Sequence, residues 1–376
     1  MNKIVVAGGG FAGVSALNIL ARRRGSGKLE LALVDTKLQA EFLPLLPDII
    51  GRAFAPDSLS YNLTQFCNWR GVTFIREEVQ AVDLKKKEVT TAASRIPYDY
   101  LIIASGSQTN FYGQSQIAQV AFTLDSVDDA RKLITALEQD NYDNFIISGA
   151  GYTGVEIATA LWRYFRRRKR ANKKIMLVEI AAELLGPLPA WMKQYVAANL
   201  RALGISVFLE SKIEKIEQDR VTLSNGEGFT RAMLIWAAGV KTADFVGNLP
   251  LEKNRQGRLK VNEYLQVDPF CFVAGDAAEV NWQGKPLRMA VQFSLAQAQI
   301  AAGNVLRSIR GLPLKKYRAL DLGYIIPLAN NRSCGVVLGV NLKGVIPTAL
   351  HFMMCIYRSF SWKNKLGILH NIITAI

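Results

Sequence analysis

The sequence predicts an α/β protein with two Rossmann-type units, and three observations lead to this fold class. A buried strand, a glycine-rich turn and a helix follow one another at the start of the chain, and the same order returns about 140 residues later. Half of the 376 residues are hydrophobic and a fifth are charged, which is enough apolar surface for two or three domain cores. Strands that alternate with helices in this way favour parallel sheets covered by helices.

The two copies are predicted from the periodicity of their apolar residues. In the first copy, the strand, the helix and the next strand are expected at residues 3–7, 11–24 and 29–35. In the second copy, they are expected at residues 144–148, 155–168 and 174–179. Each copy therefore predicts one βαβ unit.

A G-x-G-x-x-G motif occupies the first turn, at Gly8, Gly10 and Gly13. Bare backbone amides and a helix N-terminus can meet a pyrophosphate there without an intervening Cβ atom. Asp35 ends the next strand, 22 residues after Gly13, where a carboxylate can accept hydrogen bonds from a ribose diol. One such motif alone also suits a turn that exists only for packing.

The second motif repeats the whole context, which makes a purely structural explanation of both turns much weaker. Gly149, Gly151 and Gly154 follow their own strand, and Glu179 closes the next strand 25 residues after Gly154. A carboxylate there favours a free ribose 2′-hydroxyl and repels a 2′-phosphate, and residues 180–182 offer no arginine. This unit is predicted to prefer NADH to NADPH.

Further strands and turns are expected outside the two copies. Strands are expected within residues 71–95, with a polar turn at 85–87, and at 98–104, 205–222, 232–238 and 271–274, with a turn at 224–226. A helix is expected at about 289–309, and the residues after Gly311 read as a separate tail.

Cysteine and histidine usage argues against a redox dithiol or a zinc site. The four cysteines, Cys67, Cys271, Cys334 and Cys355, are far apart and form no C-x-x-C pair, and the chain has two histidines. The 46 lysines and arginines exceed the 31 acids and give a net charge of +15, which suits an anionic partner.

With these motifs, the segments Y-D-Y-L-I-I-A-S-G at 98–106 and F-V-A-G-D at 272–276 make the chain resemble the flavoprotein reductases that bind two dinucleotides. It looks most like type II NADH dehydrogenase, the NADH:quinone oxidoreductase attached to one membrane surface. The closer similarity rests on residues 42–46, 72–83 and 151–156, and the resemblance covers about residues 1–310.

The resemblance implies two cofactor sites. Residues expected to hold FAD are Gly8, Gly10, Phe11, Ala12, Gly13, Asp35, Pro44, Leu45, Val79, Ala104, Ser105, Gly106, Gly275 and Asp276. Among them, Val79 would meet the adenine through its backbone, and Pro44 and Leu45 would lie near the isoalloxazine. Residues expected to hold NADH are Gly149, Gly151, Gly154, Glu179 and Gly239.

Catalytic roles are implied for Glu156, near the nicotinamide and the flavin, and for Gln292. The family's A-Q-x-A-x-Q-Q segment appears as residues 291–297, in which Gln292 and Gln297 remain but one glutamine and two alanines are lost. Both glutamines are expected at the quinone, although the departure puts the choice of acceptor in doubt. The alternatives stay open: Glu156 as a carboxylate favoured by the helix dipole, and the glutamines as ordinary polar residues on a helix.

The expected architecture is a three-layer ββα NADH domain at residues 113–267 inserted in an FAD domain at 1–112 and 268–330. Residues 331–376 would form an amphipathic α-helical module. The implied activity is hydride transfer from NADH to FAD and transfer of two electrons to a membrane quinone, without proton pumping. One alternative is sulfide:quinone oxidoreductase, for which Cys271 and Cys334 would have to meet. The other is an NADH-responsive flavoprotein like apoptosis-inducing factor, which acts through partner binding.

The tail predicts attachment to a membrane surface. Residues 346–360 have helical periodicity, with Met353 and Tyr357 on one face and Cys355 and Ser359 on the other. The remaining members of the two faces are Ala349, Leu350 and Phe360, and His351 and Arg358. The cations beside this segment are Lys343, Lys363 and Lys365, next to Trp362, and the later apolar set is Ile368, Leu369, Ile372, Ile373 and Ile376. Such a tail can lie on anionic lipid, or dock on the core or in a homodimer.

No signal-peptide core precedes the first strand, and no stretch of about 18 uncharged apolar residues occurs. We therefore expect a peripheral protein on the cytoplasmic face of a membrane. The run R-R-R-K-R at 166–170, with Lys173 and Lys174, is expected to be a solvated loop. No aromatic stacking pattern accompanies it, which disfavours nucleic acid as a partner.

Overall fold

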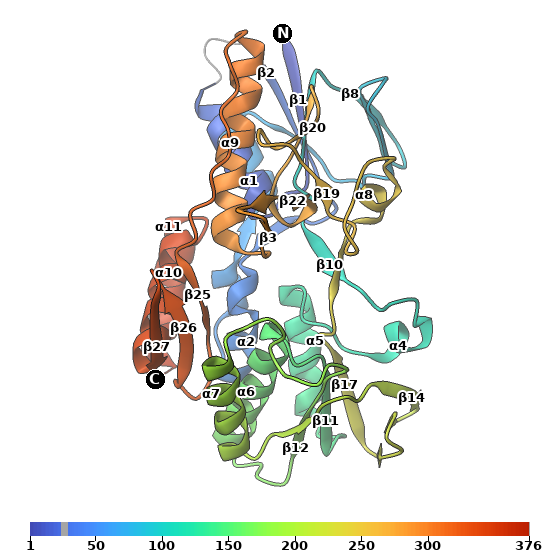
Figure 1. Ribbon diagram of the computed structural model, residues 1–376, viewed down its shortest axis with the longest axis vertical. Coiled ribbons are helices and arrows are strands. Elements are labelled where there is room, and N and C mark those ends of the chain that lie inside the picture. Colours follow the sequence, from blue (N-terminus) through green and yellow to red (C-terminus); the bar gives the residue numbers. More distant parts are fainter. Residues whose placement is uncertain (24–28, 376) are drawn as a thin grey trace. The chain divides into compact units, whose positions relative to one another are not determined.

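The computed structural model describes residues 1–23 and 29–375 and divides into two compact units (Figure 1). Unit 1 comprises residues 1–40, 61–108 and 240–321. Unit 2 comprises residues 41–60, 109–239 and 322–376. Each unit contains one of the two predicted glycine turns, and the fold is α/β with parallel sheets, as predicted.

A six-stranded sheet forms the centre of unit 1, in the order β20-β21-β9-β1-β2-β5. Its strands are β1 (Asn2–Ala7), β2 (Leu29–Val34), β5 (Thr73–Ile75), β9 (Tyr100–Ile103), β20 (Gln266–Asp268) and β21 (Cys271–Val273). All neighbouring pairs are parallel except β20 with β21. The carboxyl ends of β1, β9 and β21 therefore meet at one edge, where ligands bind in open α/β sheets.

Two long helices of unit 1 pack against each other, α1 (Phe11–Arg22) and α9 (Val291–Ile309). Figure 1 shows them side by side. Their contact faces are apolar and buried, because small and branched residues recur at helical spacing. The expected helix 11–24 ends at Arg22, and Arg24 lies outside the described residues.

Shorter elements complete unit 1. As expected between residues 71 and 95, β6 (Ala81–Asp83), β7 (Glu88–Thr90) and β8 (Arg95–Pro97) form an antiparallel sheet. The other elements are α3 (Leu63–Arg70), β18 (Val240–Thr242), α8 (Asp244–Asn248), β19 (Leu259–Lys260), η3 (Gly275–Ala277), β22 (Ala278–Glu279), β23 (Asn281–Trp282) and β24 (Lys285–Pro286). The strands β3 (Gln39–Glu41), β4 (Ser60–Asn62) and β10 (Ser107–Thr109) each contain a unit boundary.

Unit 2 has its own parallel sheet, in the order β13-β12-β11-β17. Its strands are β11 (Asn144–Ser148), β12 (Lys174–Val178), β13 (Ser206–Phe208) and β17 (Ala232–Trp236). Unit 2 also contains the helices α4 (Ser115–Val120), α5 (Val127–Glu138), α6 (Tyr152–Arg167) and α7 (Ala190–Ala202). An earlier segment of the same unit supplies η1 (Leu43–Leu45), α2 (Leu46–Arg52) and η2 (Pro56–Leu59).

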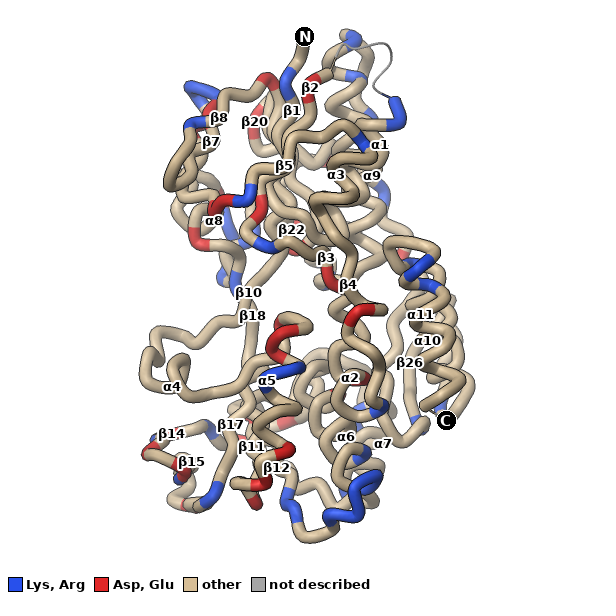
Figure 2. Tube along the Cα trace, turned by 180° about the vertical axis from the view of Figure 1, so that it is seen from behind, with Lys and Arg blue, Asp and Glu red and all other residues tan. Residues whose placement is uncertain are grey.

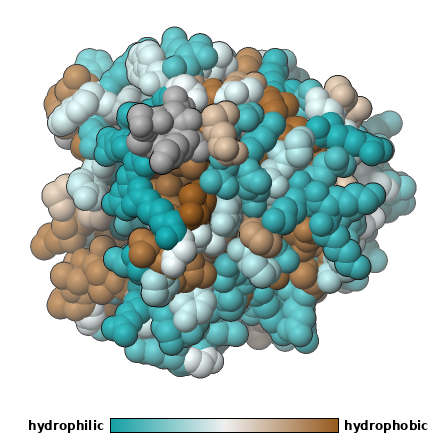
Figure 3. Space-filling model, turned by 90° about the horizontal axis from the view of Figure 1, so that it is seen from above, coloured by the Kyte–Doolittle hydropathy of each residue, from teal (hydrophilic) through white to brown (hydrophobic). Residues whose placement is uncertain are grey.

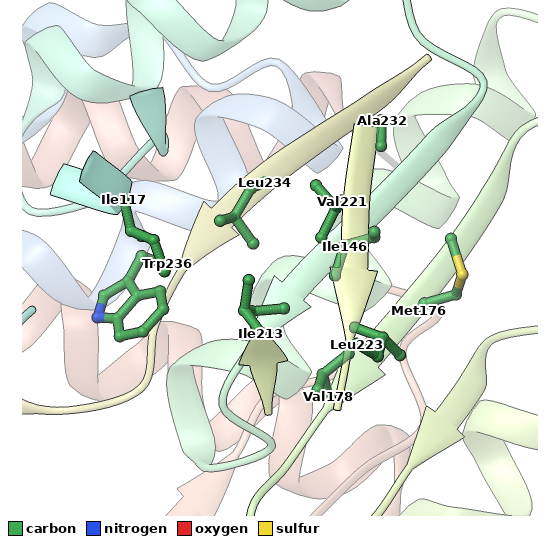
Figure 4. Packing of buried hydrophobic residues seen from close by; sticks show 10 residues of the cluster. All are labelled: Ile117, Ile146, Met176, Val178, Ile213, Val221, Leu223, Ala232, Leu234 and Trp236. Carbon is green, nitrogen blue, oxygen red and sulfur yellow. The ribbon is translucent and has the colours of Figure 1, made fainter. Parts of the chain in front are cut away.

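A second, antiparallel sheet covers one part of the unit 2 core. It consists of β14 (Ile213–Glu217), β15 (Arg220–Leu223) and β16 (Gly228–Phe229), in line with the alternation expected within residues 205–222. Val221 and Leu223 point into a cluster with Ile146, Met176 and Leu234 of the parallel sheet (Figure 4). Burying each such aliphatic side chain stabilises the fold by about 1.5–3 kcal/mol.

The C-terminal module contains the expected helices and, in addition, three strands that the sequence did not predict. An antiparallel sheet precedes its helices and consists of β25 (Gly323–Ile326), β26 (Ser333–Val337) and β27 (Val340–Gly344). The last two strands meet at Leu338 and Gly339, which both have positive φ, of 49° and 83°. A two-residue hairpin turn needs this geometry at both positions, and leucine in place of the usual asparagine hides the turn in the sequence.

The tail helices α10 (Val345–Arg358) and α11 (Trp362–Thr374) turn part of their apolar residues outward. On α10, Met353 and Tyr357 are exposed, whereas Cys355 is buried and Phe352 packs 6.0 Å from Phe54. Asparagines anchor α11, since the Asn364 amide donates to the carbonyls of Ser58 and Ser60 at 2.9 and 2.8 Å. Of the predicted apolar set, Ile376 lies outside the described residues.

No helix within residues 1–23 and 29–375 is long and apolar enough to cross a membrane. On the tail helices, the exposed large apolar side chains include those of Trp362, Tyr357, Val345, Ile373, Ile346 and Leu366. The face shown in Figure 3 is mainly hydrophilic, with its hydrophobic residues gathered in separate patches. Scattered apolar residues are normal on a protein surface, but a row of them along two helices indicates an interaction site.

Candidate functional site

The glycine turn of unit 1 lies between β1 and α1, and its three glycines are needed for different reasons. Gly8 has a φ of 108°, and a Cβ atom on it would lie 2.6 Å from the Ala104 carbonyl carbon. A Cβ atom on Gly13 would collide with the Gly8 carbonyl oxygen. Gly10 has no heavy atom within 4 Å of its Cβ position, so its backbone faces open space. Gly8 and Gly13 thus shape the turn, and Gly10 leaves room for a ligand at the helix N-terminus.

Asp35 follows β2 and holds this turn with both carboxylate oxygens. One oxygen accepts the Gly9 amide at 2.6 Å and the other accepts the Lys37 amide at 2.7 Å. Each carboxylate oxygen has a further lone pair, so Asp35 can still accept a hydrogen bond from a ribose hydroxyl. The two backbone hydrogen bonds therefore fix the position of the Asp35 carboxylate beside the glycine turn.

Two other segments of unit 1 meet this edge of the sheet. The hydroxyl of Ser105, just after β9, is buried and has no hydrogen-bond partner among the described residues. Such an atom is normally satisfied, and a bound ligand would satisfy it. Gly275, with a φ of 75°, places its Cβ position 3.2 Å from the Ala12 Cβ of α1. Asp276 accepts the Ser107 hydroxyl at 3.1 Å, and burial raises its pKa.

Gln297 supports the Gly275 turn from α9. Its side chain is 1 % exposed, and its oxygen accepts the Gly275 amide at 2.8 Å. Gln292, one and a half turns earlier, donates to Asp321 at 3.2 Å, and Asp321 also pairs with Arg288. The two glutamines thus make different contacts within unit 1.

The other residues predicted for FAD divide between the units. In unit 1, Phe11 and Ala12 begin α1, Val79 is buried before β6, and Ala104 donates its amide to Ala7 at 2.8 Å. Gly106 has a φ of 66°. In unit 2, Pro44 and Leu45 form η1 with Leu43.

The glycine turn of unit 2 repeats the arrangement between β11 and α6. Gly149 has a φ of 102°, and its Cβ position lies 2.6 Å from the Ala237 carbonyl oxygen. A Cβ atom on Gly154 would collide with the Gly149 carbonyl oxygen, and the Cβ position of Gly151 again has no heavy atom within 4 Å. The structure therefore contains a second cradle of the same shape.

Glu179 serves the second turn as Asp35 serves the first. Its oxygens accept the amides of Ala150 at 2.8 Å and Ala181 at 3.0 Å. Gly239, after β17, has a φ of 150°, and a side chain on it would collide with the Tyr112 hydroxyl. That hydroxyl donates to the Ala238 carbonyl at 3.2 Å.

Glu156 lines a small cavity in unit 2. Its position is beyond the first turn of α6, so the helix-dipole alternative loses its main support. The cavity has a volume of about 20 Å³, room for about one water molecule. Its lining residues are Pro44, Pro47, Asp48, Arg52, Glu156, Ala160, Pro327, Leu328, Ala329 and Phe352.

The two carboxyl groups in this cavity differ in their pKa values. Asp48 pairs with Arg52 at 2.7 Å, and burial nevertheless raises the pKa of Asp48 to about 6. Burial, with the Asp48 charge, raises the pKa of Glu156 to about 8. At pH 7, Glu156 is therefore mostly protonated and Asp48 mostly ionised.

Asp48 and Arg52 were missed in the sequence, although they follow directly on the segment 42–46. Their spacing of four residues on a short helix was the available signal. Close packing sets the distance between α2, which carries Asp48 and Arg52, and α6, which carries Glu156. Gly51 of α2 approaches Ala160 of α6 so closely that a Cβ atom on Gly51 would lie 2.9 Å from the Ala160 Cα.

None of the four cysteines has the character of a reactive thiol. All are buried and free, and burial raises the pKa of Cys334 to about 12 and that of Cys271 further. The described residues contain no cluster of potential metal ligands. The burial and the raised pKa of these thiols disfavour sulfur chemistry at cysteine, which sulfide:quinone oxidoreductase requires.

Two glycine turns of this shape, each fastened by a carboxylate, define the class of α/β proteins that bind two dinucleotides. The chain belongs to the pyridine nucleotide-disulphide oxidoreductase family, whose model matches residues 2–303.

Curated relatives align over most of the chain. Demethylphylloquinone reductase NdbB of Synechocystis sp. is 27% identical over 97% of this chain and 94% of its own length. The type II NADH:quinone oxidoreductase of Haemophilus influenzae is 28% identical over 89% of this chain and 87% of its own length. The fold is similar to that of NDH2 from Plasmodium falciparum in complex with NADH, with a TM-score of 0.85 at 16% identity over 99% and 97% of the two chains.

Proposed function

We propose that this protein is an FAD-dependent NADH:quinone oxidoreductase that transfers electrons without pumping protons. The observation that carries the proposal is the pair of glycine cradles, each fastened by a carboxylate that accepts two backbone amides. Family membership and the names of the curated relatives support the same reaction. The alternatives, sulfide oxidation and NADH-controlled partner binding, lack comparable support.

Two sites follow from this assignment. The FAD domain would comprise residues 1–112 and 268–330, and the NADH domain residues 113–267. Bound FAD would accept a hydride equivalent from NADH and release two electrons to a quinone. The open backbone at Gly10 and Gly151 would receive the pyrophosphates, and Asp35 and Glu179 the adenosine riboses.

The overall reaction takes up one proton from water, and a side chain that holds a proton at neutral pH could deliver it. Oxidation of NADH yields NAD⁺, one proton and two electrons, whereas a quinone takes up two protons with its two electrons. Glu156 is suited to this role because it lies in a small cavity with Pro44, and burial raises its pKa to about 8. Gln292 and Gln297 are our candidates for quinone contacts, as the family segment implies.

Attachment to an anionic lipid surface is proposed for residues 331–376, on the cytoplasmic face of the membrane. The outward side chains of Met353, Tyr357 and Trp362 would enter the lipid interface. Lys343, Arg358, Lys363 and Lys365 would meet the headgroups, at about 1 kcal/mol each. A homodimer through the same helices is the alternative, and light scattering in detergent distinguishes the two.

The decisive experiment is anaerobic reduction of the purified yellow protein. NADH is expected to bleach the flavin absorbance in one fast phase, and a ubiquinone or menaquinone analogue is expected to restore it. Sulfide should cause no bleaching. The acceptor half of the proposal fails if no quinone reoxidises the flavin faster than oxygen does.

A further inference from the structure

A groove in unit 2 is lined by three arginines. Its volume is about 380 Å³, and it is formed by Trp162, Arg163, Arg166 and Arg167 of α6 with Asn330 of the loop before β26. The arginines are spaced three and four residues apart, which places them on one face of the helix. The groove includes only part of the basic run predicted as a solvated loop.

Outside the groove, Arg168, Arg170 and Lys173 of that run form ion pairs with acidic residues. Lys173 contacts Asp140 and Asp143 at 2.9 Å each, and Arg170 lies 3.3 Å from Asp140. Arg168 lies 3.5 Å from Glu138. Figure 2 shows the run as a blue stretch at the end of α6. These ion pairs fasten the turn between α6 and β12.

The groove arginines differ, because the described part of the chain supplies no carboxylate within ion-pair distance of them. Arg163 donates to the Ala329 and Ala375 carbonyls at 2.9 and 2.7 Å. Arg167 donates to the Gly51 carbonyl at 3.3 Å, and the Arg166 guanidinium lies 5.1 Å from the Trp162 ring centre. These neutral partners orient the guanidinium groups but leave their charge in place.

The charge of the groove is therefore unbalanced. Burial, with the charges of Arg52 and Arg167, lowers the pKa of Arg163 to about 10. The carboxylate whose charge reaches Arg163 is Asp48, which is already paired with Arg52. An anion that approached all three guanidinium groups would relieve this repulsion, and phosphate matches the fork of arginine donors.

The neighbouring helix indicates where such a phosphate would come from. Arg163 is hydrogen-bonded to Ala375 at the end of α11, and Ile373, two residues earlier, is 65 % exposed. Leu366 and Leu369 precede it on the same exposed stripe of α11. An arginine groove for a charged head thus adjoins an apolar stripe for a hydrocarbon chain.

We propose that this groove binds the phosphate headgroup of an anionic phospholipid, whose acyl chain lies along α11. The site goes beyond charge attraction by the tail lysines, because it selects a headgroup through a fixed set of donors. It deepens the proposed membrane attachment, on which its setting in the lipid interface rests.

The test compares two double variants that lose the same charge. R166Q/R167Q removes the two exposed groove arginines, and R168Q/K169Q removes two cations of the same run outside the groove. Full-length protein is sedimented with vesicles of phosphatidylcholine, with and without phosphatidylglycerol. We expect the affinity for phosphatidylglycerol vesicles to fall about tenfold in the groove variant and less than about threefold in the control. Binding to phosphatidylcholine alone should not change.

Equal losses in both variants would show general charge attraction and overturn the site. Calorimetric titration with inorganic phosphate tests whether the groove binds a free anion instead of a lipid headgroup. If free phosphate binds the wild type and the groove variant loses only that binding, the ligand is a soluble anion and the lipid assignment is wrong. If the wild type binds no vesicle, membrane attachment fails, and a short-chain phosphatidylglycerol that stays monomeric in water then tests the groove alone. Absence of saturable binding to that lipid overturns the groove as well.

Discussion

The two glycine turns have the same local geometry but different surroundings. In unit 1, Asp35 accepts the amides of Gly9 and Lys37, and in unit 2 a longer carboxylate, Glu179, accepts the corresponding pair. A return segment packs on the first turn, because Gly275 lies against Ala12. In unit 2, Gly239 follows β17 as Gly106 follows β9 in unit 1, and it lies against Tyr112, a residue that is 60 % exposed.

This difference indicates which ligand stays and which exchanges. A dinucleotide in unit 1 would be held by the turn and by a second segment that is itself braced by Gln297. A dinucleotide in unit 2 would be held mainly by the turn and its carboxylate. How long a dinucleotide stays bound thus depends on the elements around the motif. FAD is therefore expected to copurify with the protein, and NADH is expected to bind and dissociate in each turnover.

The largest effect is expected from matched glycine substitutions. A methyl group on Gly13 or Gly154 would collide with a backbone carbonyl, which cannot move without opening the turn. Gly13→Ala should purify without bound flavin, whereas Gly154→Ala should stay yellow but show a KM for NADH raised more than tenfold. Absorbance at purification and steady-state kinetics measure the two outcomes. A colourless Gly154→Ala protein would contradict the difference in retention.

Removing the charge of Asp35 or Glu179, the carboxylates proposed to bind the riboses, should have a smaller effect. Glu179→Gln keeps the shape but weakens hydrogen bonds to a charged acceptor, so kcat/KM for NADH should fall about tenfold to a hundredfold. The loss should be much smaller for NADPH, because repulsion of the 2′-phosphate is removed as well. Asp35→Asn is the matched variant, and it should weaken FAD retention while the KM for NADH stays within about twofold.

A Gln297 variant tests whether the Gly275 turn supports the proposed FAD site. Gln297→Leu removes the acceptor of the Gly275 amide and leaves that buried donor unsatisfied, a cost of about 1–3 kcal/mol. The dissociation constant of FAD should therefore rise about tenfold, as measured by flavin fluorescence on dilution. Gln299→Leu, at an exposed position of the same helix, is the control and should leave the constant unchanged.

Glu156 should produce a pH effect and only a modest change in rate. Its pKa is about 8 when folded and near 4.5 when unfolded, so the folded state binds more protons between these values. Stability should therefore fall as pH rises through that window and level off above it. Glu156→Gln should flatten this dependence of Tm and remove the decline of kcat above pH 8. An unchanged pH profile in the variant would exclude Glu156 as the proton holder.

The sequence was informative wherever function depends on a local turn. Glycine spacing located both cradles and both carboxylates, because the backbone geometry tolerates few other residues there. Asp48 and Arg52 escaped detection because their importance comes from packing against α6, more than 100 residues away in the sequence. The C-terminal sheet escaped detection because Leu338 occupies a turn position that usually carries asparagine.

The contact between Gly51 and Ala160 has a consequence for tolerance to mutation. Neither residue carries a chemical group, yet a Cβ atom on Gly51 would press on the backbone of α6 and separate the helices that bear Asp48 and Glu156. In a saturation library selected for turnover, Gly51 should therefore be as depleted of variants as the residues that bind cofactor. Such a library would test the proposed proton site through a residue that cannot itself carry a proton.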